Sequence, residues 1–379
     1  MGVPRMSPPL RDYQVEFKEA IAEQYRRGSR RVLGVSPTGS GKTTVFASIC
    51  EGAAKKGKRV LLTAHREQIC DQISDRLLDY GIAHGNIRAG CYPGDQQVLV
   101  GMIQTLARRK DVAPPDLIIV DEAHLAPGPT YSRFLASHPN ARHLLVTATP
   151  CRTDGKGMGD VADALVNGPE VRWLIDRGFL SEFQLLVPPS KIDTSRCRRI
   201  GNDLNQKDLQ EVSDKAEING DALQHYLRHC RGNKHIVFTT GTAHSQHVAE
   251  IWTAGGVPTK AIWGDMEDDE LDRTIQDFRD GKLLVIAACD LITEGFDVPD
   301  VGSVSLLRET ESMRIYRQSV GRALRPAAGK KRAVILDHVG NSFMLNQQTG
   351  EMTMRHGPPD MPIEWSLDGE EPVSYTHLT

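Results

Sequence analysis

Short apolar runs alternate with helical patterns through the first half of the chain. Residues 10–27 come first, with Tyr13, Phe17 and Ile21 recurring on one side of an amphipathic helix. Five later runs have the length and apolar character of strands: residues 31–35, 60–64, 98–101, 117–120 and 143–146. The unbroken run at 117–120 is typical of a buried parallel strand. This alternation predicts an α/β domain with a doubly wound parallel sheet.

A second series of the same kind follows a break in the pattern. Residues 151–159 are glycine-rich and charged, and the Val-Pro-Pro-Ser stretch at 187–190 has the composition of a linker. The strands predicted beyond it are residues 235–239, 259–263, 283–288, 301–307 and 332–337. We therefore expect two domains, residues 1–186 and 187–340. Beyond residue 337 the pattern gives way to glycine, proline and acidic residues, as at 357–360 and 368–371, which predicts a linker-like tail over 341–372.

Composition narrows the class of protein. The chain has 379 residues, 39% hydrophobic and 25% charged, with a formal net charge of −3, which is ordinary for a globular protein. No apolar run is long enough to span a bilayer, so no membrane association is expected. A nucleic-acid partner would need a local basic cleft, for which Arg66, Arg108 and Arg109 are candidates. Seven cysteines without a C-x-x-C pair favour a reducing cytoplasm and argue against a zinc site within these residues.

The strongest chemical signal is the stretch Ser-Pro-Thr-Gly-Ser-Gly-Lys-Thr at 36–43, which joins the first predicted strand to a helical pattern. This arrangement is a phosphate-binding loop. Gly39 and Gly41 allow backbone N–H groups to surround phosphates at a helix N-terminus. Lys42 supplies positive charge to the β- and γ-phosphates, and the Thr43 hydroxyl is suited to Mg²⁺. Ser36 stands where the strict pattern has glycine, and a small residue there still permits the turn.

Two adjacent carboxylates close the buried strand at 117–120. Asp121 and Glu122 would repel each other unless a positive charge lay beside them. A Mg²⁺ ion that is also bound by Thr43 and a triphosphate would supply that charge. Asp121 is then the metal-binding carboxylate, and Glu122 is placed to orient or deprotonate the attacking water. The alternative is a strand that simply ends in solvated acids.

Two further groups of polar residues leave alternatives open. His65 and Arg66 follow a predicted strand at the edge where open α/β sheets bind ligands, although they could also begin a solvated helix. Residues 318–325 read as helical, which places Arg322 and Arg325 three residues apart on one face. Arginines of a second domain that face a nucleotide on the first are natural arginine fingers. An exposed arginine pair is the alternative.

The order of these segments resembles the superfamily 2 helicases and translocases over about residues 10–340, most closely the RadD-like bacterial and phage proteins. The matching segments are LRDYQ (10–14), SPTGSGKT (36–43), TAHREQ (63–68), IQTLARR (103–109), DEAH (121–124), TATP (147–150), VFTT (237–240), TEGFDVP (293–299) and QSVGRALR (318–325). The resemblance implies two RecA-like domains with an ATP cleft between them.

The resemblance also assigns roles that the pattern alone does not. Gln14 would read the adenine edge. The implied nucleotide contacts are Gln14, Gly39, Ser40, Gly41, Lys42, Thr43 and Asp297, with Thr43 and Asp121 on the metal. The catalytic set is Lys42, Glu122, Gln318, Arg322 and Arg325. The implied nucleic-acid contacts are His65, Arg66, Gln104, Thr105 and Thr293. The residues that would couple hydrolysis to domain motion are His124, Thr147 and Thr149.

The expected activity is an ATP- and Mg²⁺-dependent helicase or translocase moving along DNA, in the cytoplasm of a bacterium or of a phage-infected cell. The segment at 318–325 begins with Gln-Ser and lacks the His-Arg start of DEAD-box RNA helicases, which favours DNA, single-stranded or forked, over RNA. An RNA helicase remains one alternative. A clamp that binds ATP and nucleic acid without hydrolysis is another. Protein partners are not indicated.

The end of the chain carries one further expectation. Residues 373–379, Val-Ser-Tyr-Thr-His-Leu-Thr, resemble one reading frame of a transposon-end adapter used in sequencing libraries. RadD-like proteins usually continue into a cysteine-rich, zinc-binding region, which is not found here. We therefore expect a truncated gene product whose motor is complete.

Overall fold

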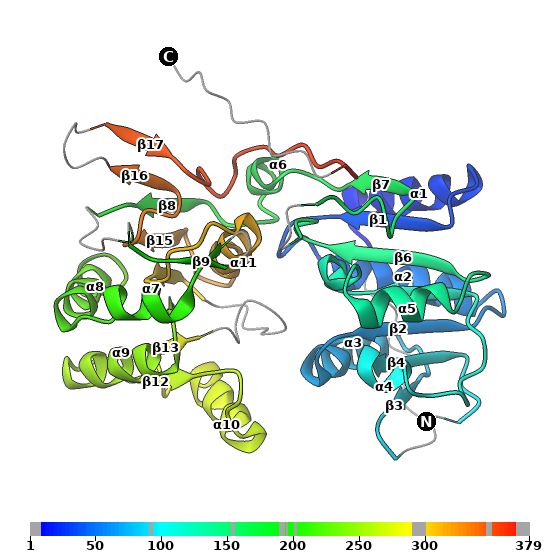
Figure 1. Cartoon of the computed structure of the whole chain (residues 1–379), viewed down its shortest axis with the longest axis horizontal. Helices are drawn as coiled ribbons and strands as arrows, with labels where there is room; N and C mark the ends of the chain where they lie inside the picture. Colours follow the sequence, from blue (N-terminus) through cyan, green and yellow to red (C-terminus); the bar gives the residue numbers. More distant parts are fainter. Residues whose placement is uncertain are drawn as a thin grey trace. The chain divides into compact units, whose positions relative to one another are not determined.

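The computed structural model describes residues 9–90, 94–152, 156–188, 194, 196–200, 203–289, 301–345 and 351–368. The chain divides into two compact units. Unit 1 contains Met1–Glu170 together with the segment that begins at Ile363, and unit 2 contains Val171–Pro362. Each unit is an α/β domain around one parallel sheet (Figure 1).

Unit 1 has a seven-stranded sheet in the order β3-β4-β2-β5-β6-β1-β7, and every described pair of strands is parallel. Its elements are α1 (Asp12–Arg26), β1 (Arg31–Val35), α2 (Lys42–Ala54), β2 (Val60–Ala64), α3 (Glu67–Asp79), β3 (Gly85–Ile87), β4 (Val98–Met102), α4 (Ile103–Leu106), β5 (Leu117–Val120), η1 (Ala123–Leu125), α5 (Pro129–Ala136), β6 (Arg142–Thr147) and β7 (Ala164–Asn167). The expected doubly wound fold is confirmed.

The sheet of unit 1 separates two hydrophobic cores. Strand β1 illustrates this, because Val32 belongs to one core and Leu33 to the other, as alternation along a strand requires. Helices α1, α2 and α3 pack on the Val32 side, through residues such as Phe17 and Phe46. Helices α4 and α5 cover the Leu33 side. Burial on both faces fixes the strands firmly, and the polar residues that follow them are held at one edge.

Unit 2 repeats this plan with a six-stranded parallel sheet in the order β12-β13-β11-β14-β15-β8. Its elements are α6 (Val171–Asp176), β8 (Phe183–Leu186), β9 (Arg199–Ile200), β10 (Asp203–Leu204), α7 (Gln206–Ser213), α8 (Ala216–His229), β11 (His235–Phe238), α9 (Thr242–Ala254), β12 (Thr259–Ile262), α10 (Asp268–Arg279), β13 (Val285–Ala288), β14 (Ser303–Leu306), α11 (Met313–Ala323), β15 (Ala333–Asp337), β16 (Phe343–Leu345) and β17 (Met352–Met354). Trp252 and Tyr226 are the largest fully buried side chains of its core.

The boundary between the units differs from the one expected after residue 186. Strand β8 pairs in parallel with β15, with Phe183 opposite Ala333, so the chain has entered unit 2 before the proline-rich stretch. The four residues of β8, Phe-Gln-Leu-Leu, are all half-buried, and this short run stands directly before the proline-rich stretch. The prolines therefore follow an edge strand of the second sheet and do not mark the linker.

The predicted linker-like tail also differs from the structure. Residues 341–345 and 351–362 belong to unit 2 and include the antiparallel pair β16–β17, whereas Trp365 and Leu367 pack against a core of unit 1. The turn after β15 is held by Asp337, whose Oδ2 accepts hydrogen bonds of 2.6 Å from the backbone N–H and the hydroxyl of Ser342. A few hydrogen bonds and packing contacts thus hold this segment in place, although its composition does not predict ordered structure. Residues 373–379 lie outside the described residues.

Candidate functional site

The predicted phosphate-binding loop connects β1 to α2 as expected. Gly39 and Gly41 both have φ of +84°, a left-handed conformation that side chains other than glycine rarely adopt. Ser36 is 3% exposed, and its hydroxyl donates a hydrogen bond of 2.7 Å to the hydroxyl of Ser40. Serine at this position therefore stabilises the loop from within, and the departure from the strict sequence pattern does not disturb its geometry.

Two side chains of α1 brace the loop from outside. The Tyr13 hydroxyl and the Gln14 amide both donate to the carbonyl oxygen of Ser40, at 2.8 and 3.0 Å. The Gln14 Oε1 atom accepts a hydrogen bond from the backbone N–H of Arg11. A Cβ atom on Gly41 would lie 2.5 Å from Gln14 Nε2, so the glycine leaves room for this amide. In this arrangement Gln14, which is 4% exposed, positions the phosphate loop.

Lys42 and the carboxylates after β5 lie near one another at the same edge of the sheet. Burial raises the pKa of Asp121, the negative charge of Glu122 raises it further, and the positive charge of Lys42 acts in the opposite direction. The Lys42 ammonium group donates to the carbonyl oxygen of Pro37 at 3.3 Å. A buried carboxyl group with a raised pKa beside a second acid is suited to a cation.

Glu122 has a backbone conformation that sets it apart. Its φ of 50° makes it the one non-glycine residue with positive φ in the described part of the chain. Such a conformation costs about 1–3 kcal/mol and is concentrated at functional sites. The backbone N–H of Glu122 donates to Asp121 Oδ1 at 2.9 Å, which ties the two residues together.

A chain of contacts leads from Glu122 toward the loop after β6. His124 Nδ1 lies 3.4 Å from Glu122 Oε2 and 3.4 Å from Thr147 Oγ1. The Thr147 hydroxyl donates to the carbonyl oxygen of Thr149 at 3.1 Å and accepts from its backbone N–H at 3.2 Å. His124, Thr147 and Thr149 are all buried. Of the residues expected to couple hydrolysis to motion, His124 contacts the candidate base directly, and Thr147 and Thr149 are linked to it through His124.

The candidate nucleic-acid contacts of unit 1 come from two adjacent strands. His65 and Arg66 follow β2, and Gln104 and Thr105 lie in α4 directly after β4. The Gln104 amide donates to the carbonyl oxygen of His65 at 3.3 Å, so the two motifs touch. Gln104 is exposed and the other three are half-buried. The structure thus brings all four together at the carboxyl edge of the sheet.

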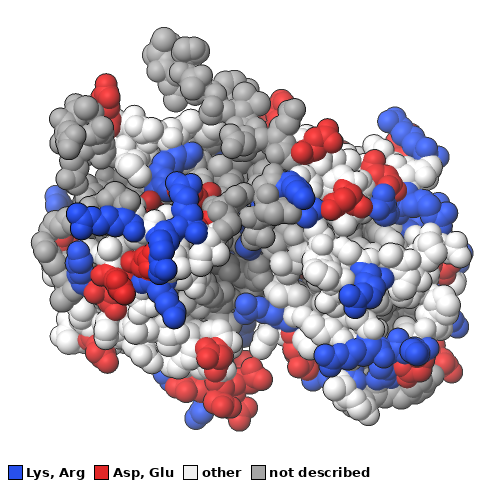
Figure 2. Space-filling view, in the orientation of Figure 1, with Lys and Arg blue, Asp and Glu red and all other residues white. Residues whose placement is uncertain are grey.

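Arg108 and Arg109, two of the basic residues expected in a nucleic-acid cleft, differ in their surroundings. Arg109 forms an ion pair of 2.6 Å with Asp111, whereas Arg108 is exposed. Figure 2 shows positive and negative side chains interspersed on the visible face of each unit. Acids gather at the start of α10, whose first turn contains Asp268, Asp269 and Glu270.

Helix α11 of unit 2 carries Gln318 and Arg322, which are 2% and 7% exposed. The helix ends at Ala323, and Arg325 lies beyond its C-terminal cap. The expectation that Arg322 and Arg325 share one helical face is therefore wrong. Pro326 disfavours a helical conformation at Arg325, so the helix ends before Arg325 and is shorter than the motif suggests.

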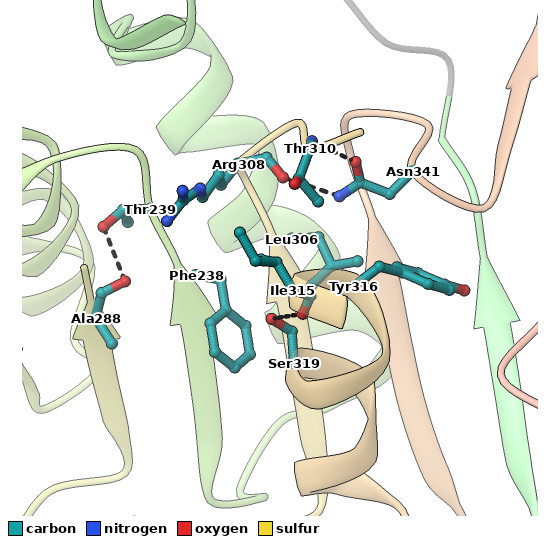
Figure 3. A pocket seen from close by; sticks show the side chains of 10 residues that line it. All are labelled: Phe238, Thr239, Ala288, Leu306, Arg308, Thr310, Ile315, Tyr316, Ser319 and Asn341. Atoms are coloured by element: carbon teal, nitrogen blue, oxygen red, sulfur yellow. Dashed lines mark hydrogen bonds between the residues drawn. The ribbon is translucent and has the colours of Figure 1, made fainter. Parts of the chain in front are cut away.

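A small pocket lies at the carboxyl edge of the second sheet, beside the start of α11 (Figure 3). It is lined by Phe238, Thr239, Ala288, Leu306, Arg308, Thr310, Ile315, Tyr316, Ser319 and Asn341. Asn341 bridges one side, because its amide donates to the carbonyl oxygen of Arg308 at 2.8 Å and its Oδ1 accepts from the backbone N–H of Thr310 at 2.9 Å. Sequence analysis missed Arg308, Thr310 and Asn341. The polar residues 308–310, which follow β14, could have indicated Arg308 and Thr310 as candidates.

The remaining predicted site residues are Thr43, Thr293 and Asp297. Thr293 and Asp297 lie outside the described residues. Thr43 is half-buried at the start of α2. Over the described ranges, no group of three or more His, Cys, Asp or Glu side chains is arranged to hold a metal ion. Nor is any described helix long and apolar enough to cross a membrane.

The fold and this site define a two-domain P-loop protein with an acidic pair after the central strand. Two family models match the chain: "Type III restriction enzyme, res subunit" over residues 7–152 and "Helicase conserved C-terminal domain" over residues 219–327. A 51.5 kDa protein of a Lactococcus phage (isolate 7-9) is 32% identical over 330 residues, which cover 87% of this chain and 68% of that protein. The Saccharomyces cerevisiae protein IRC3 is 29% identical over 363 residues, and the match spans 89% of this chain and 52% of that protein.

Solved structures agree on the fold. A fragment described as an HsdR subunit of a type I restriction enzyme from Vibrio vulnificus YJ016 superimposes with a TM-score of 0.70 at 21% identity, covering 88% of this chain and 66% of that one. S. cerevisiae Dbp5 bound to RNA superimposes with a TM-score of 0.58 at 17% identity, covering 86% and 87%.

The chain belongs to the superfamily 2 helicases, which are ATP-dependent nucleic-acid helicases and translocases. The predicted family and the two RecA-like domains are confirmed, and the phage relative is consistent with the RadD-like resemblance.

Proposed function

We propose that this chain is a DNA-stimulated ATPase that moves along its nucleic acid. The observation that carries the proposal is the convergence of Lys42, Asp121 and Glu122 at the edge where the phosphate loop begins α2. A lysine, a carboxyl group of raised pKa and a strained acid have little structural use together. They suit the hydrolysis of a phosphoanhydride bond.

The nucleotide and metal contacts follow from this loop. Backbone N–H groups of residues 39–43 would hold the phosphates, and Lys42 would bind the β- and γ-phosphate oxygens. Thr43 and Asp121 would hold Mg²⁺, which takes oxygen ligands and keeps several waters, so one hydroxyl and one carboxylate suffice. Bound ATP and Mg²⁺ supply the reacting phosphate and its charge neutralisation. Glu122 would accept the proton of the attacking water.

Unit 2 would complete the reaction. Arg322 is proposed as the arginine finger that stabilises charge on the transferred phosphoryl group. Gln318 lies on the same helix, one turn earlier, and would orient either the water or Arg322. Arg325 lies past the end of α11, so its proposed contribution is the weaker one. Asp297 would contact the nucleotide and Thr293 the nucleic acid.

His65, Arg66, Gln104 and Thr105 are proposed to hold the phosphate backbone of the nucleic acid, with low sequence specificity and strong salt dependence. Motion would pass from Glu122 through His124 to Thr147 and Thr149, whose contacts are continuous.

Relatives support DNA as the partner. A protein of Sulfurisphaera tokodaii named DNA 3′-5′ translocase XPB2 is 24% identical over 364 residues. The LlaBIII restriction-modification enzyme bound to DNA superimposes with a TM-score of 0.64. Dbp5 bound to RNA supports the alternative of an RNA helicase. ATPase rates with single-stranded DNA, duplex DNA, forked DNA and RNA of matched length would separate these alternatives. The bacterial cytoplasm remains the proposed location.

The test of the proposed function is Glu122→Gln. Removing the base should lower ATP turnover by roughly two to four orders of magnitude while ATP binding stays within a few-fold of wild type. Turnover is measured with and without DNA, and binding with a fluorescent ATP analogue. Glu16→Gln on the exposed side of α1 is the matched control and should leave both values unchanged. Turnover of Glu122→Gln within a few-fold of wild type would rule out its role as the base. A wild-type protein that binds ATP and DNA without hydrolysis would favour the clamp.

A further inference from the structure

The chain passes between the two units twice. The first passage follows Glu170, and the second follows Pro362 and leads back to unit 1. A single linker would allow the units to rotate about many axes, whereas two linkers restrict the motion. What the two passages are attached to therefore decides which motions the protein can make.

The first passage begins at the phosphate loop. The backbone N–H of Gly168 donates to the carbonyl oxygen of Val35 at 2.7 Å, at the end of β1. A Cβ atom on Gly168 would lie 2.8 Å from the hydroxyl oxygen of Ser36. The backbone of this passage thus lies directly against the first residue of the loop. Three residues later, α6 of unit 2 begins at Val171.

The second passage is attached to α11, the helix of Arg322. The Tyr316 hydroxyl donates to the carbonyl oxygen of Gly357 at 2.8 Å, and the Tyr316 ring stacks on His356 at 5.2 Å between centroids. The next residue of α11, Arg317, donates to the carbonyl oxygens of Pro359 and Met361. Two neighbouring residues of α11 therefore contact the passing chain at four positions, 356, 357, 359 and 361.

The two passages leave unit 2 side by side. Arg172, the second residue of α6, lies 3.4 Å from the carboxylate of Asp360, two residues before the second passage leaves unit 2. Arg172 also pairs with Asp176 and Glu182, which raises its pKa and holds its guanidinium group in place. The two linkers thus share one attachment region on unit 2.

On unit 1 the second passage ends in a hydrophobic contact. Trp365 and Leu367 pack against the core formed by residues such as Met158 and Val161. The backbone N–H of Gly159 donates to the carbonyl oxygen of Leu367 at 3.0 Å. From Met361 to Trp365 there are four Cα–Cα steps, so these attachment points can never be more than about 15 Å apart. This bound holds for any arrangement of the units.

We propose that residues 356–367 are a hinge strap: they form the second of two linkers that make up the hinge, and they tie α11 to unit 1. Paired linkers that leave unit 2 together restrict opening to rotation about one narrow region. The proposal rests on the proposed function for its catalytic consequence, because there Arg322 completes a site that the phosphate loop begins. Arg317 is then a positioning residue for Arg322.

The test lengthens the strap without removing its contacts. Twelve Gly/Ser residues inserted between Pro362 and Ile363 leave both attachment sites intact. The matched control carries the same insert after Asp368, past the last contact of the strap. Spin labels at Glu19→Cys on unit 1 and Asp272→Cys on unit 2 report the distance between the units by pulsed EPR. Cys91, Cys151 and Cys197 are first changed to serine, and the other four cysteines are buried.

Lengthening the strap should broaden the nucleotide-free distance distribution, and the control should match wild type. The ATP KM should rise roughly three- to tenfold with kcat nearly unchanged, because saturating ATP restores the closed arrangement. An unchanged distance distribution overturns the hinge strap. A broader distribution with an unchanged ATP KM overturns its coupling to the site. If wild type lacks ATPase activity, the proposed function fails, while the distance measurement still decides the hinge.

Discussion

The two units build the working edges of their sheets in different ways. In unit 1 the candidate catalytic residues lie in segments that follow strands, as Lys42 follows β1 through the loop and Asp121 follows β5. In unit 2 the loop before α11 is held by partners that are distant in sequence. Thr310 donates from its hydroxyl to Asp203 at 2.8 Å and from its backbone N–H to Asn341, and its carbonyl oxygen lies 2.8 Å from His356 Nε2.

This difference has a physical reason. A phosphate loop positions its ligand with its own backbone, so a short segment suffices and leaves a recognisable pattern. The loop of unit 2 instead positions a helix and its arginine, and that requires contacts from several directions. Arg355 and Glu309 add a nearly buried ion pair of 2.7 Å to the same loop. The phosphate loop of unit 1 can therefore be predicted from local sequence, whereas the contacts that hold the loop before α11 in unit 2 become visible only in the folded structure.

The largest expected effect separates the two arginines of unit 2. Arg322→Ala should lower ATP turnover roughly a thousandfold if it acts as a finger. Arg325→Ala should have a much smaller effect, because Arg325 lies past the end of α11. Steady-state ATPase and DNA affinity are measured for both variants, with urea unfolding to check the fold. Weakened DNA affinity at unchanged turnover would place Arg322 on the nucleic-acid surface instead.

The same contrast explains what sequence alone could predict. Five strands of each sheet and the phosphate loop were predicted because apolar periodicity and glycine spacing are local signals, whereas the short strands β3 and β7 of unit 1 were not predicted. Strand β8 was missed because its run of four residues is short and stands directly before prolines that have the composition of a linker. The structure of residues 341–345 and 351–368 was missed because Tyr316 and Arg317, which lie in another element, hold part of that chain in place. The bracing of the phosphate loop by Tyr13 and Gln14 could not be foreseen either, because only the fold brings α1 to Ser40.

A smaller effect should distinguish the units by pH. Burial lowers the pKa of His235 and His338 to about 3 and that of His244 to about 4, all in unit 2. The unfolded chain then binds protons that the folded unit does not, so stability falls as pH drops through about 6.5. Between pH 7.5 and 5.5 each buried histidine should cost about 1 kcal/mol. Pulsed hydrogen exchange in urea at several pH values would report each unit separately.

Other groups act against this pH effect. The negative charges of Asp221 near His338 and Asp214 near His244 raise those pKa values partway. Burial raises the pKa of Asp337, so the folded unit binds a proton there at a higher pH than the unfolded chain does. This group therefore adds stability as the pH falls from its folded pKa toward the ordinary pKa of aspartate. His338→Gln should flatten the pH dependence of unit 2. Equal slopes in both units would contradict the prediction.

The smallest expected effect concerns the bracing of the phosphate loop in unit 1. Tyr13→Phe removes one hydrogen bond to the Ser40 carbonyl oxygen, worth about 0.5–1.5 kcal/mol, and should raise the ATP KM by roughly two- to tenfold at most. Gln14→Ala removes the second hydrogen bond to the same oxygen and should do the same through the loop.

The pair of variants also tests whether Gln14 reads adenine. If it does, Gln14→Ala should lower the preference for ATP over GTP, measured as the ratio of their kcat/KM values, by roughly tenfold or more, because a site built to hydrogen-bond its substrate rejects one lacking that partner. Tyr13→Phe, which disturbs the same carbonyl oxygen without touching the base, should leave the ratio unchanged. Equal ratios in wild type and both variants would mean that Gln14 braces the loop and nothing more. Unit 1 would then also use side chains of a separate helix to position its loop. The two units would differ only in how many such contacts they use.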